Sequence, residues 1–270
     1  MKIRLAVLTA LISLALTASA FAAELKINGS TTVFPIMQKA IEAYMAKHPD
    51  VKISLSGGGS GNGIKAIIDS TTDIAMASRK MEEKEIELAK TKGVQPKEIV
   101  VAKDAVAAIV NPANTVENLT TQQLSDIYSG KITNWGDVGG EKGPIAVISR
   151  DSSSGTFETW QELVVGKKVK VTPDALLQAS SGAVLQAVSK NKNAISYDGL
   201  GYVDKTVKAL KVNGVAPSAK TALDNTYPVS RSLQIYVNGE PKGDVKGLID
   251  FLLSAEGQKL VAEAGFVPLK

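Results

Sequence analysis

Three loops of small residues, each predicted to lie where a strand gives way to a helix, are the segments best suited to chemistry. The first amides of a helix lack an internal partner and carry partial positive charge, so the turn before them attracts an anion. Glycine lets the backbone approach a ligand closely, and hydroxyl groups add short donors. The loops are residues 28–32 (NGSTT), 56–63 (SGGGSGNG) and 150–156 (RDSSSGT).

A permanently charged residue, Arg150, opens the third loop. Its guanidinium presents a planar fork of donors that suits a tetrahedral oxyanion. Taken one at a time, the loops are explained more simply, because Ser and Thr are common helix caps and Gly-rich stretches are common turns. The three together, with an arginine leading one of them, favour a site for a small anion.

Nucleotide-binding motifs are the sharper rival interpretation of the glycine-rich loop. A Walker loop needs a lysine after its last glycine, whereas Ile64 follows Gly63. Gly61 and Gly63, with Ala66 after them, match the dinucleotide fingerprint only weakly. We therefore expect no nucleotide here.

Residues for catalysis or metal binding are scarce. His48 is the single histidine and there is no cysteine, so neither a zinc site nor a Ser-His-Asp triad is expected. We predict no catalytic residues, no metal, no cofactor and no enzymatic activity. An enzyme acting on phosphate esters is the rival class, and it would need a nucleophile, base or metal centre that the sequence does not present.

The first 23 residues predict export. Lys2 and Arg4 precede an apolar run, residues 5–16, and small residues follow to position 23, which is the order of a cleaved signal peptide. The apolar run is shorter than the roughly 20 residues that span a bilayer. Because the chain has no cysteine, lipid attachment through an N-terminal cysteine is excluded. We expect a free periplasmic protein and not a lipoprotein.

The charge balance argues against nucleic acid as a partner. Lys and Arg number 31 against 27 Asp and Glu, and two of the basic residues lie in the signal segment. Non-specific nucleic-acid binding relies on a dense basic face. A chain with so small a net charge does not predict such a face. We expect a monomer that holds one small anion in a local pocket.

Short β-branched runs alternate with helical patterns, which predicts an α/β fold. Strands are expected at residues 25–27, 51–55, 74–77, 145–148, 194–197 and 207–212. Helices are expected at residues 33–47, 64–68, 82–92, 121–128, 156–164 and, as more than one helix, 243–264.

Two longer apolar segments, residues 99–110 and 232–237, flank the middle of the chain and are predicted to cross between two lobes. Lobe 1 is then discontinuous, with residues 24–104 and 232–270, and lobe 2 comprises residues 105–231. Each lobe is expected to be a mixed sheet flanked by helices.

Over essentially the whole mature chain, the sequence resembles the phosphate-binding component of Pst-type ABC importers, within the type II periplasmic binding proteins. The resemblance is carried by residues 29–32 (GSTT) with Pro35, 59–65 (GSGNGIK), 73–79 (DIAMASR), 124–132 (LSDIYSGKI) with Asn134 and Trp135, and 150–156. It implies a receptor that closes around inorganic phosphate and delivers it to an inner-membrane permease complex.

The resemblance also implies which residues bind phosphate. Thr31 and Thr32 donate from hydroxyl and backbone, Ser60 donates from the helix after the glycine-rich loop, and Arg150 supplies the fork. Ser154, Gly155 and Thr156 surround the remaining oxygens, and Ser30 and Arg79 are additional candidates.

The sequence departs from the best-known members of the family at Arg79, where they have an aspartate that accepts the phosphate proton and helps to reject sulfate. Other branches share the Ser78-Arg79 pair, so phosphate stays the favoured ligand. Two interpretations of Arg79 remain open: a second cationic contact to the ligand, or a surface or inter-lobe residue. The alternative functions are a receptor for sulfate, molybdate or tungstate, and a secreted phosphate sensor without a transport role.

Overall fold

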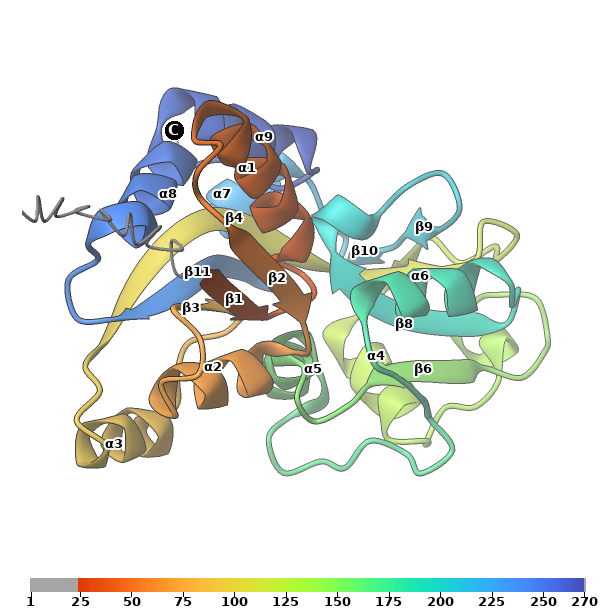
Figure 1. Cartoon of the computed structure of the whole chain (residues 1–270). Helices are drawn as coiled ribbons and strands as arrows, with labels where there is room; N and C mark the ends of the chain where they lie inside the picture. Colours follow the sequence, from red (N-terminus) through yellow and green to blue (C-terminus); the bar gives the residue numbers. More distant parts are fainter. Residues whose placement is uncertain (1–23, 270) are drawn as a thin grey trace, which may run out of the picture.

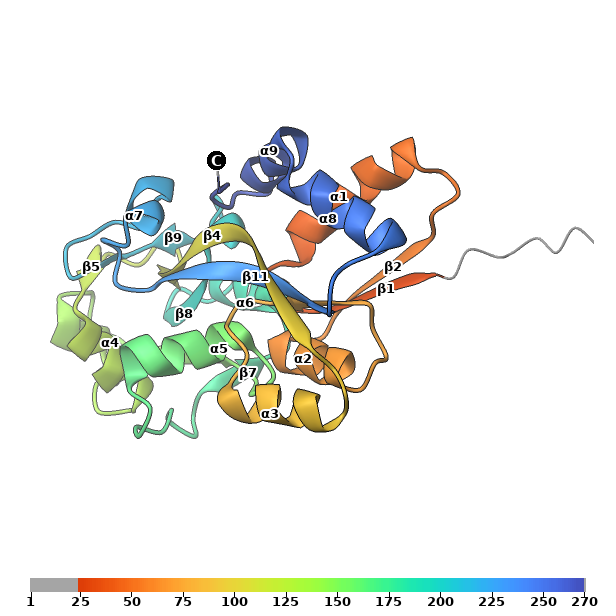
Figure 2. The same cartoon turned by 90° about the vertical axis from the view of Figure 1, so that its left-hand side faces the viewer.

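Two long strands, β4 (Pro96–Val110) and β11 (Ser230–Asn238), run side by side through the computed structural model, which describes residues 24–269 (Figure 2). They pair antiparallel from Ala105 opposite Ser230 to Pro96 opposite Asn238, with a register shift between Leu233 and Gln234. These are the two strands predicted to cross between lobes. The predicted signal peptide lies outside the described residues.

The other strands extend this pair on both sides into a nine-stranded mixed sheet in the order β2-β1-β3-β11-β4-β8-β6-β7, with β9 also paired to β4. A separate two-stranded sheet is formed by β5 and β10. The remaining strands are β1 (Leu25–Gly29), β2 (Ile53–Gly57), β3 (Ile74–Ala77), β5 (Asn118–Leu119), β6 (Ala146–Arg150), β7 (Leu176–Gln178), β8 (Ala194–Gly199), β9 (Lys208–Ala209) and β10 (Lys211–Val212).

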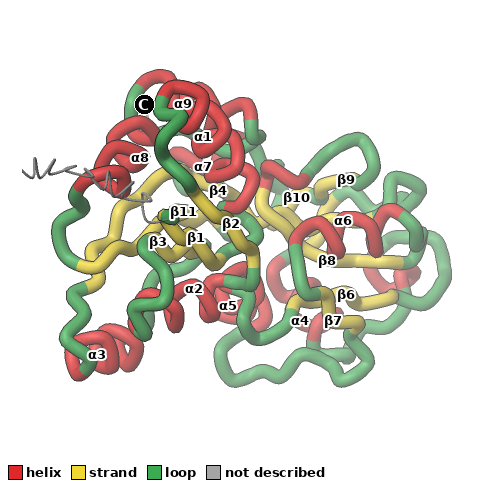
Figure 3. The backbone as a smooth tube through the Cα atoms, in the orientation of Figure 1, coloured by secondary structure: helices red, strands yellow, loops and turns green. Residues whose placement is uncertain are grey.

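Helices cover the sheet, with α1, α8 and α9 gathered on one side of its first part and α2 and α3 on the other (Figures 1 and 3). The described α-helices are α1 (Phe34–Lys47), α2 (Ser60–Ile68), α3 (Glu83–Thr91), α4 (Thr121–Tyr128), α5 (Gly155–Trp160), α6 (Ser181–Ser189), α7 (Ala219–Leu223), α8 (Gly243–Leu253) and α9 (Ala255–Glu263). Shorter helical turns are η1 (Trp135–Val138), η2 (Gln161–Val165) and η3 (Leu200–Tyr202). The fold is therefore mixed α/β, as the alternating pattern predicted.

Two large hydrophobic cores lie toward opposite ends of the paired strands β4 and β11. Core A takes its residues from both ends of the described chain, between Leu25 and Ala102 and between Leu233 and Phe266. Core B takes almost all of its residues from the middle, between Ala105 and Val229, with Val267 added. Strands β4 and β11 each contribute to both regions and pass from one core to the other.

Local differences from the predicted elements have local causes. Helix α2 begins at Ser60 rather than Ile64, because Gly59, at a φ of 96° that favours glycine, ends the loop. The helix predicted at residues 156–164 changes after Trp160 into a π-helical turn. The strand predicted at residues 207–212 is broken into β9 and β10 at Leu210.

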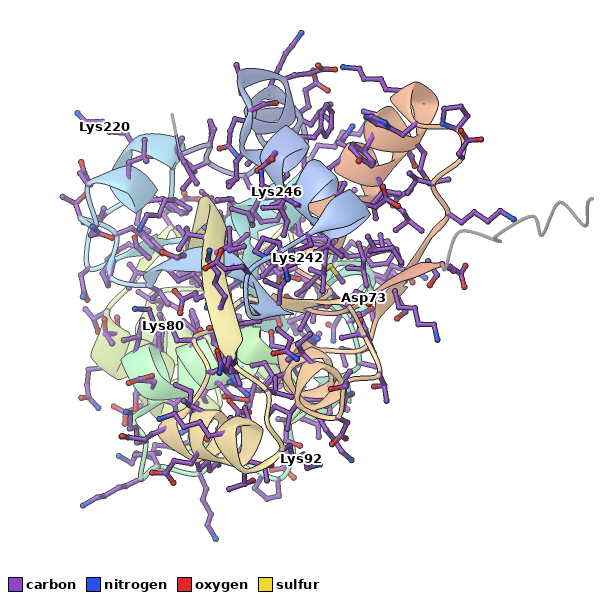
Figure 4. The ribbon with its side chains drawn as sticks, turned by 60° about the vertical axis from the view of Figure 1, so that its left-hand side comes forward. Asp73, Lys80, Lys92, Lys220, Lys242 and Lys246 are labelled. Atoms are coloured by element: carbon purple, nitrogen blue, oxygen red, sulfur yellow. The ribbon has the colours of Figure 1, made fainter. Side chains whose placement is uncertain are left out.

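In Figure 4, Lys242 and Lys246 lie near each other at the start of α8, whereas the other labelled lysines lie apart. Lys80, Lys92, Lys220 and Lys242 are separated from one another across loops and helix ends on this face (Figure 4). None of the helices within residues 24–269 combines the length and the apolar character needed to cross a bilayer.

Candidate anion site between the two cores

The three predicted loops meet where the core A half faces the core B half. Thr32 Oγ1 lies 2.9 Å from Thr156 Oγ1, which joins the first loop to the third. The Gly61 amide donates to the Ser153 carbonyl at 2.9 Å, and Ser153 Oγ donates to the Gly58 carbonyl at 3.1 Å, which joins the second loop to the third. Helices α2 and α5 consequently lie next to each other across the boundary (Figure 1).

The two halves approach each other closely at Gly155, and the contact requires a glycine. A Cβ atom placed on Gly155 would lie 2.4 Å from Ser60 Oγ and 2.9 Å from Ser78 Oγ. Ser60 itself is fully buried, and its Oγ accepts from the Ser78 amide at 3.0 Å. The helix starts of α2 and α5 are thus brought together around a shared group of hydroxyls.

Arg150 is the charged residue of this group, and its side chain is buried, with 2% exposed. Its Nε donates to the Gln178 carbonyl at 3.0 Å, and its Nη2 donates to the Ala179 carbonyl at 3.2 Å and to Thr31 Oγ1 at 3.3 Å. None of the ion pairs formed within residues 24–269 includes Arg150. A buried guanidinium without a bound carboxylate is costly, so this position favours an anion.

The hydroxyls around Arg150 are arranged as donors. Thr31 Oγ1 accepts from Arg150 Nη2 and from the Ser181 amide, both at 3.3 Å, so its own hydrogen is free to donate. Thr156 Oγ1 accepts from Arg231 Nη1 at 3.1 Å, and Ser60 Oγ accepts from the Ser78 amide. Hydroxyls of both halves thus gather at this boundary, where Thr32 bonds to Thr156 and Ser60 to Ser78, and groups of this kind can donate to an oxyanion.

Two predicted site residues use their hydroxyls for local hydrogen bonds: Ser30 in the turn before α1, and Ser154 as the N-cap of α5. Ser30 Oγ accepts from the amides of Thr32 and Val33 at 3.2 and 3.4 Å, and Ser154 Oγ accepts from the Phe157 amide at 3.2 Å. Both residues are buried next to the cluster. Their side chains shape the loops, which is the simpler interpretation that the sequence allowed.

Arg79 lies in an ion-pair network rather than among the hydroxyls. It pairs with Glu85, with Nη1 2.7 Å from Oε2, and its Nε contacts Glu158 on α5. Burial raises the pKa of Glu158, while the charge of Arg79 opposes that rise. Since Glu85 and Glu158 belong to opposite halves, the geometry fits the inter-lobe interpretation of Arg79.

Four polar residues of the cluster were not recognised from the sequence: Asp104, Ser181, Asp198 and Arg231. Ser181 opens α6, a helix that is not among those predicted from the sequence, and it follows the capping residue Ser180. The run Ser180-Ser181-Gly182 before apolar Val184 carries the same signal as the other three loops. Asp104 could have been noticed because it interrupts an apolar strand.

Asp198 is a buried carboxyl one side chain away from Arg150. Its Oδ1 accepts from Ser181 Oγ and from the Gly199 amide, both at 2.8 Å. Its Oδ2 has no hydrogen-bond partner within residues 24–269. Burial raises the pKa of Asp198 to about 6, opposed by the Ser181 hydrogen bond and by the charge of Arg150.

The described residues offer no alternative centre for metal chemistry. No group of three or more His, Cys, Asp or Glu residues between positions 24 and 269 is arranged to hold a metal ion. His48 is exposed and stacks on Tyr44 at a centroid distance of 4.3 Å, at the end of α1.

Comparison with known proteins places the chain in a family. Residues 16–256 match the model of the PBP superfamily domain. The phosphate-binding protein PstS of Borreliella burgdorferi is 34% identical over 255 residues, which cover 90% of this chain and 89% of that protein.

Solved structures agree in fold and in length. A putative phosphate ABC transporter substrate-binding protein with bound phosphate from Clostridium perfringens is 39% identical, with a TM-score of 0.86 over 92% of this chain and 100% of that one. An ABC-type phosphate transport receptor from Vibrio cholerae is 35% identical, with a TM-score of 0.74 over 90% and 99%. The chain therefore belongs to the PBP superfamily, in the family of the PstS phosphate-binding proteins.

Proposed function

We propose that this protein is an extracytoplasmic receptor that binds inorganic phosphate between its two halves and delivers it to an ABC importer. The observation that carries the proposal is the buried guanidinium of Arg150, which has hydroxyls of both halves around it and no carboxylate bound to it. The names of the relatives point to the same ligand.

The proposed phosphate contacts are the hydroxyls and helix-start amides of Thr31, Thr32, Ser60 and Thr156, the fork of Arg150, and the backbone of Gly155. Ser154 contributes by capping α5, and Ser30 by accepting hydrogen bonds in the turn before α1. Charge-assisted hydrogen bonds in a dehydrated site offset the loss of the anion's hydration.

Closure is proposed as a movement of two lobes about β4 and β11. Residues 24–104 and 232–270 form the first lobe and residues 105–231 the second, in keeping with the separate cores A and B. Phosphate binds the donors of one lobe, and closure then adds those of the other and expels water. Binding and closure are thus a single event, so an importer that recognises the closed form recognises the phosphate-bound protein.

The remaining parts of the proposal concern the protein's place in the cell. Residues 1–23 would direct export to the periplasm, the mature chain would be a monomer without lipid, and an inner-membrane permease complex would be its partner. No enzymatic role is proposed.

Titration calorimetry of the mature chain, with residues 1–23 removed, tests the ligand. We expect binding of phosphate with one site per chain, displacement by arsenate, and little heat from sulfate, molybdate or tungstate between pH 6 and 8. Tighter binding of sulfate or molybdate than of phosphate would contradict phosphate as the ligand. Turnover of a chromogenic phosphate ester would show that the protein is an enzyme.

A further inference from the structure

An ion pair between Asp104 and Arg231 lies where the two crossing strands pass between the cores. The two residues are opposite each other in the β4–β11 register. Arg231 Nε and Nη2 donate to Asp104 Oδ2 at 3.0 and 2.8 Å, and the side chains are 6% and 0% exposed. Asp104 Oδ1 accepts from the Leu200 amide at 2.9 Å, so the carboxylate is held by a third donor.

The remaining nitrogen of Arg231 contacts both halves of the molecule. Its Nη1 donates to the Ser78 carbonyl at 3.2 Å, at the end of β3 in the core A half, and to Thr156 Oγ1 at 3.1 Å, on α5 in the other half. Because Asp104 occupies Nε and Nη2, the guanidinium cannot turn away from these two acceptors without losing the ion pair. The ion pair between the strands therefore orients the Arg231 guanidinium. Its hydrogen bonds to both Ser78 and Thr156 form only when the two halves are together.

We infer that Arg231 is a positioning residue for phosphate binding, one that acts through Thr156 and stabilises the closed arrangement of the two halves. The inference rests on the proposed function. Arginine can only donate hydrogen bonds, so Thr156 Oγ1 must accept from it, and the Thr156 hydrogen is directed to another acceptor. Thr32 Oγ1, 2.9 Å away, is an acceptor within reach, although either of these two hydroxyls can donate to the other, and an oxygen of a bound anion can take its place.

This assignment separates the two arginines that could supply a second positive charge to the site. Arg79 forms ion pairs with two carboxylates, those of Glu85 and Glu158. Arg231 instead donates directly to Thr156, a residue predicted to bind phosphate. A charge held in a buried site also acts more strongly than one in water.

The experiment measures the Kd and koff of inorganic phosphate, and the urea unfolding curve without phosphate, for a set of variants. Arg231→Lys keeps a charge near Asp104 but cannot donate to Asp104, Ser78 and Thr156 together. The double variant Asp104→Asn/Arg231→Gln removes both charges at once, so that no carboxylate is left buried and unpaired if a single change impairs folding. Lys103→Gln is the matched control, because Lys103 pairs with Ser232 at the next register position of the same ladder.

We expect Arg231→Lys and the double variant to raise Kd at least 10-fold, chiefly through a faster koff, while Lys103→Gln stays within about 2-fold of the parent. In a Thr156→Ala background, Arg231→Lys should change the Kd by less than about 3-fold, because the hydroxyl through which Arg231 acts is absent. Parent-like binding by Arg231→Lys, or effects that add fully with Thr156→Ala, would overturn the inference alone. A parent protein that binds no phosphate would overturn the proposed function itself.

Discussion

At the scale of single residues, the molecule surrounds one buried positive charge with hydroxyl donors. Arg150 donates to two carbonyls and to Thr31 and Ser181, from elements on both sides of the boundary. The contacts to Gln178, Ala179 and Ser181, which belong to the same half as Arg150, fix the guanidinium in place before any ligand arrives, and such preorganisation lowers the cost of binding.

Replacing Arg150 tests this arrangement. Arg150→Ala removes the fork, and we expect phosphate binding to weaken by about 2–5 kcal/mol, the usual cost of truncating one partner of a buried charged contact. Arg150→Lys keeps the charge without the fork and should fall between the parent and Arg150→Ala. Calorimetry gives both values, and an unchanged Kd in Arg150→Ala would remove Arg150 from the site.

Asp198 should make the stability of the ligand-free protein depend on pH. Its pKa rises from 3.8 to about 6 on folding, so the folded state favours the protonated acid. The corresponding stability is fully present below pH 3.8 and is lost as the pH rises through 6, by about 3 kcal/mol in all. Urea unfolding from pH 4 to 8 should therefore show Asp198→Asn gaining on the parent by up to that amount, and parallel curves would contradict the assignment.

At the scale of elements, helix starts must come within contact distance of each other, and Gly155 is where they do so. Gly155→Ala places a Cβ atom 2.4 Å from Ser60 Oγ in the closed arrangement. We expect phosphate affinity to fall at least 10-fold, while unfolding without ligand changes by less than about 1 kcal/mol, because an opened cleft relieves the clash. Gly182→Ala at the start of α6 is the control, since its Cβ meets nothing within 4 Å.

The network of Arg79 gives a second prediction for elements. Because Glu158 on α5 is its partner in the opposite half, Arg79→Met and Glu158→Gln should each weaken phosphate binding by about 3- to 10-fold, and the double variant by little more. A ligand contact at Arg79 would instead give a loss well beyond 10-fold that Glu158→Gln does not share. Lys92→Met, in an exposed pair with Asp69, should have no effect on binding.

At the scale of the whole molecule, the sequence predicts the architecture better than it predicts the complete site. Alternating β-branched and helical segments predict the α/β class, and the apolar lengths of residues 99–110 and 232–237 predict the crossing strands. The loops that bear Thr31, Ser60, Arg150 and Thr156 are recognisable because glycine and hydroxyl residues at helix starts have a local physical meaning.

The partners of these residues depend on tertiary register, which local patterns do not contain. Arg231 and Asp104 are 127 positions apart and meet only because β11 pairs with β4 in one register. The Ser181 amide donates to Thr31 Oγ1, 150 positions away in the sequence. Ser181 opens a short helix whose serines and glycine are typical of a loop. Long-range pairing of this kind follows from the fold rather than from spacing along the chain.

The central claim is that phosphate is held between the two halves, and a crystal structure of the mature chain grown with phosphate measures it directly. We predict a tetrahedral anion within hydrogen-bond distance of Arg150 and Thr31 on one side and of Ser60 and Thr156 on the other, with both crossing strands in place. A phosphate bound elsewhere on the molecule, with no anion in contact with Arg150, Thr31, Ser60 or Thr156, would contradict the account.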